Sequence, residues 1–292
     1  MNVLSLFDGI SCGQVALARA GKEVSKYFAS EICKDAMAVT NARFPNTIQL
    51  GDVKTVTATK INDPIDLVMG GSPCQGFSMA GKKLNFEDPR SKLFLEFVRI
   101  LQEIKPRYFL LENVKMDKKS RDIITNLLGV NPIEINSSLV SAQNRIRYYW
   151  TNIAGVAQPN DKSIYLSNII DLKAERNWVD TSKIKTMYPT TNYLQYDLSG
   201  KGYKSQDQRA FYLHKKHGTV PSHRAKSKVK FIIPKKDKQP MKIGMLTPIE
   251  VERLQTLPDN YTDVGLSTSK RMSTVGNGWT VEVIAHILRK IP

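Results

Sequence analysis

The first 150 residues alternate between short apolar runs and longer segments whose apolar residues recur at helical spacing. Runs of this length and composition are typical of strands buried in a parallel sheet. The predicted strands are residues 3–7, 26–30, 48–50, 65–69 and 108–111, and the predicted helices are residues 14–20, 33–43, 92–104 and 121–128. Alternating strands and helices indicate an α/β fold. In such folds ligands bind at the carboxyl ends of the strands, where we expect the functional residues.

One cysteine follows such a strand end. The apolar run 65–69 is ended by Gly70 and Gly71. Pro73 then stiffens the turn that carries Cys74. Thiolate chemistry needs a partly exposed cysteine, and a turn at a strand end provides one. The simpler alternative is a buried structural cysteine, which is what most lone intracellular cysteines are. The position at the strand end favours the reactive role.

Length and composition indicate a folded protein with one large domain, or one domain and a smaller partner. The chain has 292 residues, of which 41% are hydrophobic. Its 3 cysteines are too few, and oddly numbered, for a disulfide framework, which predicts a reducing cytosol. The N-terminus lacks the basic region of a signal peptide, and no run reaches the roughly 18 apolar residues of a membrane span.

Positive charge is concentrated in one middle segment. The net charge is +16, and residues 151–246 carry 18 Lys and Arg against 7 Asp and Glu. Residues 160–245 show no alternation of strands and helices, and they mix lysines with tyrosines and prolines. This mixture indicates a surface that reads a nucleic-acid groove, with a solvated basic surface as the alternative. His214, His217 and His223 have no cysteine nearby and no diagnostic spacing, so we expect no metal site.

Small and acidic residues follow several predicted strands. Residues 8–13 form a small-residue turn after the first strand, of the kind that lets the backbone approach a nucleotide-type cofactor. Glu31 ends the second strand, where an acid commonly binds ribose hydroxyls; alternatively it is a carboxylate at a helix N-terminus. Asp52 lies at the same edge and could accept a hydrogen bond from an adenine amino group. Glu112 ends the fifth strand and would share the cleft of the cysteine, or else be an exposed glutamate before a loop.

Two arginines precede the basic segment. Residues 137–139 are predicted to begin an extended region, and Arg145 and Arg147 alternate farther along it. Alternation puts both guanidiniums on one face of a strand. Two such charges repel each other unless an anion or an acceptor lies between them, which favours a binding role.

Regular structure returns after the basic segment. Thr247 is a predicted N-cap, with Pro248 at the first helical position and Glu250 three residues on, the pattern of a capping box. Residues 276–281 form a small-residue turn that leads into a predicted helix over residues 281–290. We expect this closing helix to pack back against the first strand.

Together these motifs resemble the DNA (cytosine-5) methyltransferase family over nearly the whole chain. Five segments match the motifs of the family in its order: Phe7-Asp8-Gly9-Ile10-Ser11-Cys12-Gly13, Pro73-Cys74-Gln75, Glu112-Asn113-Val114, Gln143-x-Arg145-x-Arg147 and Gly276-Asn277. Three details resemble the vertebrate de novo branch: Phe7-Asp8-Gly9-Ile10, Ser141-x-x-Asn144-Arg145-x-Arg147-Tyr148-x-Trp150 and Trp279. The compact length resembles a bacterial or phage enzyme. Two positions depart from the family, with Asp8 where many members have Ala and Ser11-Cys12 where many have Gly-Gly.

The resemblance implies a doubly wound, Rossmann-like fold of the S-adenosylmethionine-dependent methyltransferases, with a smaller, mostly irregular or β target recognition domain. Residues 1–155 and 246–292 would form the catalytic domain, on which the C-terminal helix packs back. Residues 156–245 would form the basic target recognition domain. The expected location is the cytoplasm of a bacterial or phage-infected cell.

The resemblance also implies a mechanism. Cys74 would attack C6 of a cytosine flipped out of duplex DNA, so that C5 can accept the methyl group of S-adenosylmethionine. A protonated Glu112 would donate to N3 and Arg147 would hold O2. Arg145 would orient Glu112 or a nearby phosphate, and residues 76–91 would close over the flipped base.

Further contacts follow from the same resemblance. The expected cofactor contacts are Phe7, Asp8, Gly9, Ile10, Ser11, Cys12, Glu31, Ile32, Asp52, Val53, Ser72, Pro73, Asn277, Gly278 and Trp279. The expected DNA contacts are Gln75, Ser78, Lys215, Lys216, Arg224, Lys226 and Lys228. Besides double-stranded DNA, the partner would be a cognate restriction endonuclease, or none in an orphan enzyme.

Three other functions are compatible with parts of this pattern. A tRNA cytosine-5 methyltransferase uses the same chemistry, but the Cys-Phe-Thr tripeptide of that branch is absent from the sequence. A non-catalytic DNA-binding regulator on this fold could lose Cys74 or Glu112, and both are present. An amino-methyltransferase would need an Asp/Asn-Pro-Pro-aromatic motif, which the sequence lacks.

Overall fold

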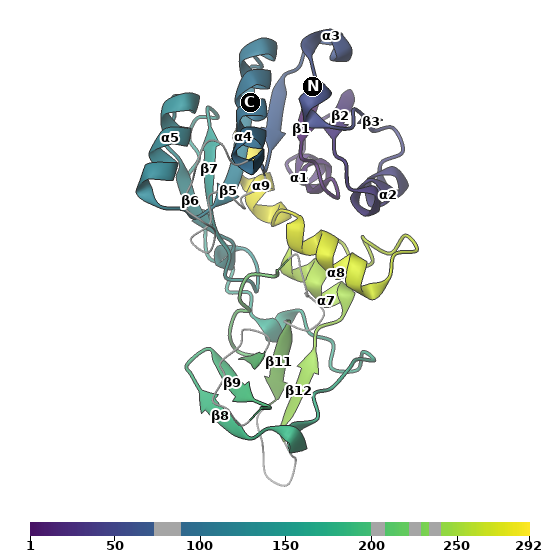
Figure 1. The fold of residues 1–292 in the computed structure, drawn as a ribbon, viewed down its shortest axis with the longest axis vertical. Helices are drawn as coiled ribbons and strands as arrows, with labels where there is room; N and C mark the ends of the chain where they lie inside the picture. The colour runs from purple at the N-terminus through teal and green to yellow at the C-terminus, as the bar shows by residue number, and fades with distance from the viewer. Residues whose placement is uncertain (73–88, 200–207, 222–228, 234–240) are drawn as a thin grey trace. The chain divides into compact units, whose positions relative to one another are not determined.

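The structure, a computed structural model, describes residues 1–72, 89–199, 208–221, 229–233 and 241–292 (Figure 1). The chain forms two compact units. The first comprises Met1–Asn136, Ile146–Pro159 and Val281–Pro292, and the second comprises Ser137–Arg145 and Asn160–Thr280. Residues 246–280, which we expected in the catalytic domain, thus lie in the second unit. The boundaries of the catalytic and target recognition domains stay a prediction.

In the described residues, the first unit is built on a seven-stranded sheet with the order β3-β2-β1-β4-β5-β7-β6. Its strands are β1 (Asn2–Leu6), β2 (Lys26–Ser30), β3 (Ile48–Gln49), β4 (Leu67–Gly70), β5 (Tyr108–Val114), β6 (Ile133–Asn136) and β7 (Ile146–Thr151). Neighbouring strands from β3 to β5 run parallel, whereas β7 runs antiparallel to β5 and β6. The five predicted strands are confirmed, and the fifth continues through the Glu-Asn-Val motif.

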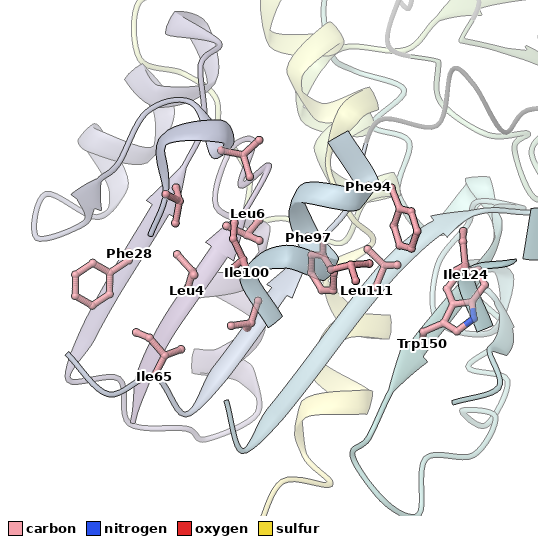
Figure 2. Close-up of a cluster of buried hydrophobic side chains, with 14 of the residues drawn as sticks. Leu4, Leu6, Phe28, Ile65, Phe94, Phe97, Ile100, Leu111, Ile124 and Trp150 are labelled. Atoms are coloured by element: carbon pink, nitrogen blue, oxygen red, sulfur yellow. The ribbon is translucent and has the colours of Figure 1, made fainter. Parts of the chain in front are cut away.

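Helices cover both faces of this sheet. The described helices of the first unit are α1 (Cys12–Arg19), α2 (Lys34–Arg43), α3 (Ala58–Ile61), α4 (Pro89–Ile104), α5 (Lys118–Leu128) and α9 (Val281–Leu288), with the 3-10 turn η1 (Val53–Thr55). None of the helices in the described residues has both the length and the apolarity needed to cross a membrane. On one face, α4 places Phe94, Phe97 and Ile100 in a buried cluster (Figure 2). Leu4 and Leu111 contribute to it from the strands.

Helix α1 packs closely on the opposite face. A Cβ at Gly13 would lie 2.3 Å from Met69 Cε and 2.9 Å from the Tyr27 hydroxyl oxygen. Successive side chains of a strand point to opposite faces, so Val68 joins the α4 cluster while Met69 meets α1. Helices on both faces of a mainly parallel sheet confirm the predicted doubly wound α/β fold.

The closing helix α9 returns to the start of the chain. We expected it against the first strand, whereas its main contact is with α1. Arg19 Nη1 of α1 lies 3.1 Å from Glu282 Oε1 of α9. His286 Nε2 lies 2.8 Å from the carbonyl oxygen of Ala157. The last helix therefore completes the layer that α1 begins.

The second unit has its own sheet, five-stranded in the described residues, with the order β12-β11-β10-β9-β8. Its strands are β8 (Thr186–Pro189), β9 (Tyr193–Asp197), β10 (Arg209–Tyr212), β11 (Lys230–Ile233) and β12 (Lys242–Met245). Leu194, Ile232 and Ile243 form a small core on one face. Residues 137–139 form a 3-10 turn, η2 (Ser137–Leu139). The prediction that an extended region begins there is therefore wrong.

Among the residues of the second unit that the structure describes, two α-helices follow the sheet, α7 (Pro248–Leu254) and α8 (Thr268–Asn277). The predicted capping box of α7 is confirmed. Thr247 Oγ1 accepts from the Glu250 backbone N–H at 3.3 Å, and Glu250 Oε2 accepts from the Thr247 N–H at 2.8 Å. Helix α8 was not predicted. Gly276 and Asn277, which we expected in a turn, form its last residues.

Candidate active site

The turn after β1 has an unusual backbone. Phe7, Gly9 and Ser11 have φ angles of 57°, 60° and 55°. Glycine adopts this left-handed conformation readily, whereas residues with a Cβ avoid it. Ser11 is also the N-cap residue of α1, so the turn sets where the helix begins. The two non-glycine residues therefore need support from the surrounding structure.

The Asp8 carboxyl is buried next to Tyr27 of β2. The Tyr27 hydroxyl donates to Asp8 Oδ1 at 2.7 Å, and the Ser11 hydroxyl donates to Oδ2. Burial raises the pKa of Asp8 to about 6, although both hydroxyls act in the opposite direction. The Asp8 carboxyl thus binds two side chains of the protein itself. The cofactor contact predicted for Asp8 involves its backbone, so the two do not conflict.

Glu31 follows β2 and binds the same turn. Its Oε2 accepts from the Gly9 N–H at 2.8 Å, and its Oε1 accepts from the N–H groups of Ile32 and Cys33, each at 2.8 Å. A carboxylate offers about four acceptor positions, which leaves capacity for a ribose hydroxyl. Ile32 is 73% exposed, an apolar side chain that a bound ligand would cover.

Asp52 and Val53 lie after β3 and differ in burial. Asp52 is exposed and caps η1, accepting from the Lys54 N–H at 3.0 Å. Val53 is buried in the core cluster of the first unit. An exposed Asp52 fits the predicted adenine contact, whereas the side chain of Val53 is occupied by packing.

Asn113 joins β5 to the segment that leads to the predicted nucleophile. Its Nδ2 donates to Ser72 Oγ at 3.1 Å, and both residues are buried. Its Oδ1 accepts from the Val114 N–H at 2.8 Å, which orients the amide. The predicted site residues Pro73, Cys74, Gln75 and Ser78 lie outside the described residues, as do residues 76–88 of the predicted closing loop.

Glu112 and Arg147 form an ion pair across β5 and β7. Arg147 Nε lies 2.9 Å from Glu112 Oε1, and the two side chains are 13% and 10% exposed. In the antiparallel register Glu112 faces Tyr149 and Arg147 faces Val114, so the pair is diagonal. Glu112 thus lies on the same strand as Asn113, which binds Ser72, and Arg147 reaches Glu112 from the neighbouring strand.

Arg145 and Arg147 bind different partners. It precedes β7, belongs to the second unit and is 5% exposed. Its guanidinium donates to the carbonyl oxygens of Gly278 at 3.1 Å and Gly276 at 3.5 Å. The prediction that both guanidiniums share one face of a strand is not confirmed, because β7 begins at Ile146, although the Arg145 carbonyl still accepts from the Ser137 N–H at 3.0 Å. The role implied for Arg145 stays a prediction.

The segment after α8 is held by a buried glutamine. Gln255 Nε2 donates to the carbonyl oxygen of Gly278 at 3.0 Å, and its Oε1 accepts from Thr280 Oγ1 at 2.8 Å. Of the predicted cofactor residues here, Gly278 and Trp279 are buried and Asn277 is exposed. They belong to the second unit, and their contact with the cofactor stays a prediction.

Two of the predicted DNA-binding lysines are described. Lys216 Nζ donates to the carbonyl oxygen of Ser138 and lies 3.6 Å from Asp161 Oδ1, so part of its charge is used within the second unit. Lys215 is half-buried. Gln75, Ser78, Arg224, Lys226 and Lys228 lie outside the described residues.

Sequence reasoning missed three supporting residues, Tyr27, Asn113 and Gln255. A tyrosine inside a buried strand signals that its hydroxyl needs a partner, but not which one. Asn113 lies inside a motif that we had identified, yet only the structure links it to Ser72. In the described residues, no group of three or more His, Cys, Asp and Glu side chains could hold a metal ion.

The residues at these strand ends fit a nucleoside cofactor. Glu31 retains acceptor capacity for a ribose hydroxyl, and Ile32 exposes an apolar surface for a purine. The left-handed turn 7–11 brings backbone close to the same strand ends. Hydroxyl acceptors beside an apolar surface are what an adenosine group requires.

Comparisons with known proteins agree with this geometry. Residues 1–292 match the family model of the C-5 cytosine-specific DNA methylases. The chain is 32% identical to the Type II methyltransferase M1.ScrFI of Lactococcus lactis subsp. cremoris, over 99% of this chain and 77% of that protein. It is 28% identical to the Type II methyltransferase M.NlaX of Neisseria lactamica, over 99% and 95%. A solved structure of a Spodoptera frugiperda DNMT2 mutant has a TM-score of 0.72 at 20% identity, covering 99% of this chain and 98% of that one.

These findings fit together. The family model spans every residue of the chain, and the solved structure shares its fold. The fold is the Rossmann-like one of the S-adenosylmethionine-dependent methyltransferases, as the motifs predicted. This chain therefore belongs to the C-5 cytosine-specific DNA methylase family and is a DNA cytosine-5 methyltransferase.

Proposed function

We propose that this methyltransferase acts on a cytosine flipped out of double-stranded DNA, with Cys74 as a transient covalent nucleophile. The observation that carries the proposal is the ion pair of Glu112 and Arg147, 2.9 Å apart and nearly buried. The next residue on the strand, Asn113, binds Ser72, two residues before Cys74. A nucleophile, an acid and a guanidinium are what activation of a cytosine ring requires.

The proposed reaction is an addition to C6, a methyl transfer to C5 and an elimination. The Cys74 thiolate adds to C6, and the electron pair of the C5–C6 double bond makes C5 nucleophilic while negative charge builds at N3 and O2. Both roles require the ion pair to open in the complex: a protonated Glu112 donates toward N3, and Arg147 donates hydrogen bonds to O2. S-adenosylmethionine, when bound, supplies the methyl group. A base then removes the C5 proton, the C5–C6 double bond re-forms, the thiolate leaves C6, and the proton shared with N3 returns to Glu112.

The same proposal assigns the cofactor site to the strand ends of the first unit. Glu31 would bind the ribose, Asp52 and Ile32 the adenine, and the turn 7–11 the methionine part. This assignment is supported by the remaining acceptor capacity of Glu31 and the exposure of Ile32. The cofactor contact predicted for Asn277, Gly278 and Trp279 rests on the family resemblance alone.

DNA recognition is assigned to the basic segment, residues 156–245, with residues 1–155 and 246–292 as the catalytic domain. The support is its charge, since residues 151–246 hold most of the positive excess of the chain. Lysines and arginines that neutralise phosphates release counterions, so DNA affinity should fall steeply as salt rises. The partner would be a restriction endonuclease, which the Type II names of two relatives favour, or none in an orphan enzyme.

Bisulfite sequencing of DNA from expressing cells tests the function. Wild-type protein should leave cytosines methylated in one consistent sequence context, and Cys74→Ala should leave them unmodified. The variant should still bind S-adenosylhomocysteine, because the thiol takes no part in holding the cofactor. A parallel assay on tRNA separates the alternative substrate. Unmodified DNA together with methylated tRNA would refute DNA as the substrate, and methylation by Cys74→Ala would refute the nucleophile.

A further inference from the structure

A buried network supports the turn after β1. The Asp8 carboxyl accepts from Tyr27 at 2.7 Å and from Ser11. The Ser11 hydroxyl oxygen in turn accepts from Thr40 Oγ1 at 3.2 Å and from Gln14 Nε2 at 3.3 Å. Asp8, Ser11, Tyr27 and Thr40 are all buried. The network connects the turn to β2, α1 and α2, and the mechanism above uses none of these side chains.

Two members of the network, Ser11 and Asp8, would each destabilise the fold if they had no partner. Ser11 holds φ at 55°, a conformation that costs residues with a Cβ free energy. Asp8 is a carboxyl with 8% exposure, and the Glu31 carboxylate raises its pKa further. The Ser5 hydroxyl also faces the carboxyl, without a hydrogen bond of normal geometry among the described residues. The hydrogen bond between Asp8 and Ser11 offsets both costs, because the carboxyl gains a donor and the strained serine gains an anchor.

The packing of α1 makes room for the third member. A side chain at Gly13 would place its Cβ 2.9 Å from the Tyr27 hydroxyl oxygen. Glycine at this position therefore lets the hydroxyl reach Asp8 between the sheet and the helix. The network depends on the local fold of the first unit and not on one isolated contact.

We propose that Asp8, Ser11 and Tyr27 are positioning residues that hold the turn 7–11 in its cofactor-binding conformation. The inference rests on the proposed use of this turn in the S-adenosylmethionine site. Tyr27 fixes the carboxyl to the sheet, and the carboxyl fixes Ser11 three residues later. The Asp8 N–H also donates to the Ser30 carbonyl at 3.1 Å, so the turn is joined to β2 at two points, and the Gly9 N–H joins it to Glu31 just after the strand.

The first test is Tyr27→Phe, which keeps the ring and removes one hydroxyl. The Kd for S-adenosylhomocysteine, measured by calorimetry, should rise roughly tenfold, the factor that corresponds to one buried hydrogen bond. The KM for S-adenosylmethionine should rise equally while kcat changes less than about twofold. A matched control is Thr125→Val, which removes the hydroxyl partner of Trp150 Nε1 in the same unit. This control should lower the melting temperature and leave the Kd unchanged.

The second test is a double-mutant cycle. Asp8→Ala alone leaves Ser11 strained without its anchor, and Ser11→Gly alone leaves a buried carboxyl with one donor fewer. Both single variants should bind S-adenosylhomocysteine roughly tenfold more weakly. The double variant Asp8→Ala/Ser11→Gly loses the shared hydrogen bond only once, so its loss in affinity should be close to that of Asp8→Ala alone and well below the product of the two single losses.

The outcomes separate the inference from the function on which it rests. If the folded wild type fails to bind S-adenosylhomocysteine, the proposed cofactor site is wrong. If the wild type binds and folded Tyr27→Phe binds equally well, the positioning role is wrong. Losses that simply add in the double variant would also overturn it, since the two side chains would then act independently.

Discussion

Arg147 Nε lies 2.9 Å from Glu112 Oε1, on the diagonal between two antiparallel strands of the first unit. The separation along the chain is 35 residues, yet the register of β5 and β7 brings the two side chains together. Both side chains are nearly buried, so each charge depends largely on the other. Removing one partner would leave the other buried and unpaired, which is costly.

Glu112→Gln should abolish most of the methyl transfer. The amide keeps the shape of the acid but cannot deliver a proton toward N3. We expect a fall of at least about 100-fold in the single-turnover rate, in the range found for removal of one transition-state donor. Binding of S-adenosylhomocysteine is the control and should be unchanged. A variant with more than a tenth of the wild-type rate would show that this carboxyl is not the acid.

Asn113 should be needed as a donor, not merely as a residue of the right size. Asn113→Asp keeps the oxygen that accepts from Val114 but loses the N–H group that donates to Ser72. We expect a loss of about 1–3 kcal/mol in the free energy of unfolding and a lower kcat, because Cys74 follows two residues after Ser72. Denaturant titration and steady-state kinetics measure the two effects. If Asn113→Asp matches the wild type in both, the link has no role.

The buried pair of Arg176 and Glu250 should stabilise the second unit strongly. Arg176 Nη1 lies 2.9 Å from Glu250 Oε2, and both side chains are 1% exposed. Glu250→Gln should cost about 3–5 kcal/mol in denaturant unfolding, because the buried guanidinium loses its counter-charge. Asp122→Asn, which breaks an exposed pair with Lys118, is the control and should leave the free energy of unfolding nearly unchanged. Equal effects for the two variants would contradict this assignment.

His217 should make the second unit sensitive to acid. Its ring is buried beside Phe211, with ring centroids 4.4 Å apart, and burial lowers its pKa to about 4. The unfolded chain binds a proton near pH 6.5 and the folded one does not, so the free energy of unfolding falls as the pH drops from 6.5 toward 4. The full loss is about 3 kcal/mol.

Denaturant titration of wild type and His217→Phe at pH 7 and pH 4.5 measures this effect. The variant should lose less stability between the two pH values than the wild type does. His214→Gln, at an exposed histidine, should behave as wild type. Asp8 acts in the opposite direction, because its raised pKa favours the folded state below about pH 6, so the comparison between variants is more informative than the wild-type curve alone. Identical pH dependence in wild type and His217→Phe would refute the role of His217.

Much of the fold could be read from local patterns. The strands β1 to β5 were predicted because apolar runs bounded by glycine and proline are short-range signals, and the capping box of Thr247 and Glu250 lies within four residues. Helix α8 was missed because Gly276 and Asn277 are typical of turns. Arg145 was placed on a strand because periodicity does not reveal where pairing begins, and β7 starts one residue later.

The motif order alone was enough to identify the family and the reaction, because catalysis requires particular residue types within short segments. The motif order does not predict the contacts that support the site. That Tyr27 binds Asp8, that Asn113 binds Ser72 and that Arg147 meets Glu112 diagonally follow from strand order and register. Such pairings join residues 19, 41 and 35 positions apart, and no local pattern encodes them. They arise only when the sheet assembles, since burial makes each polar group find a partner from whichever strand lies beside it.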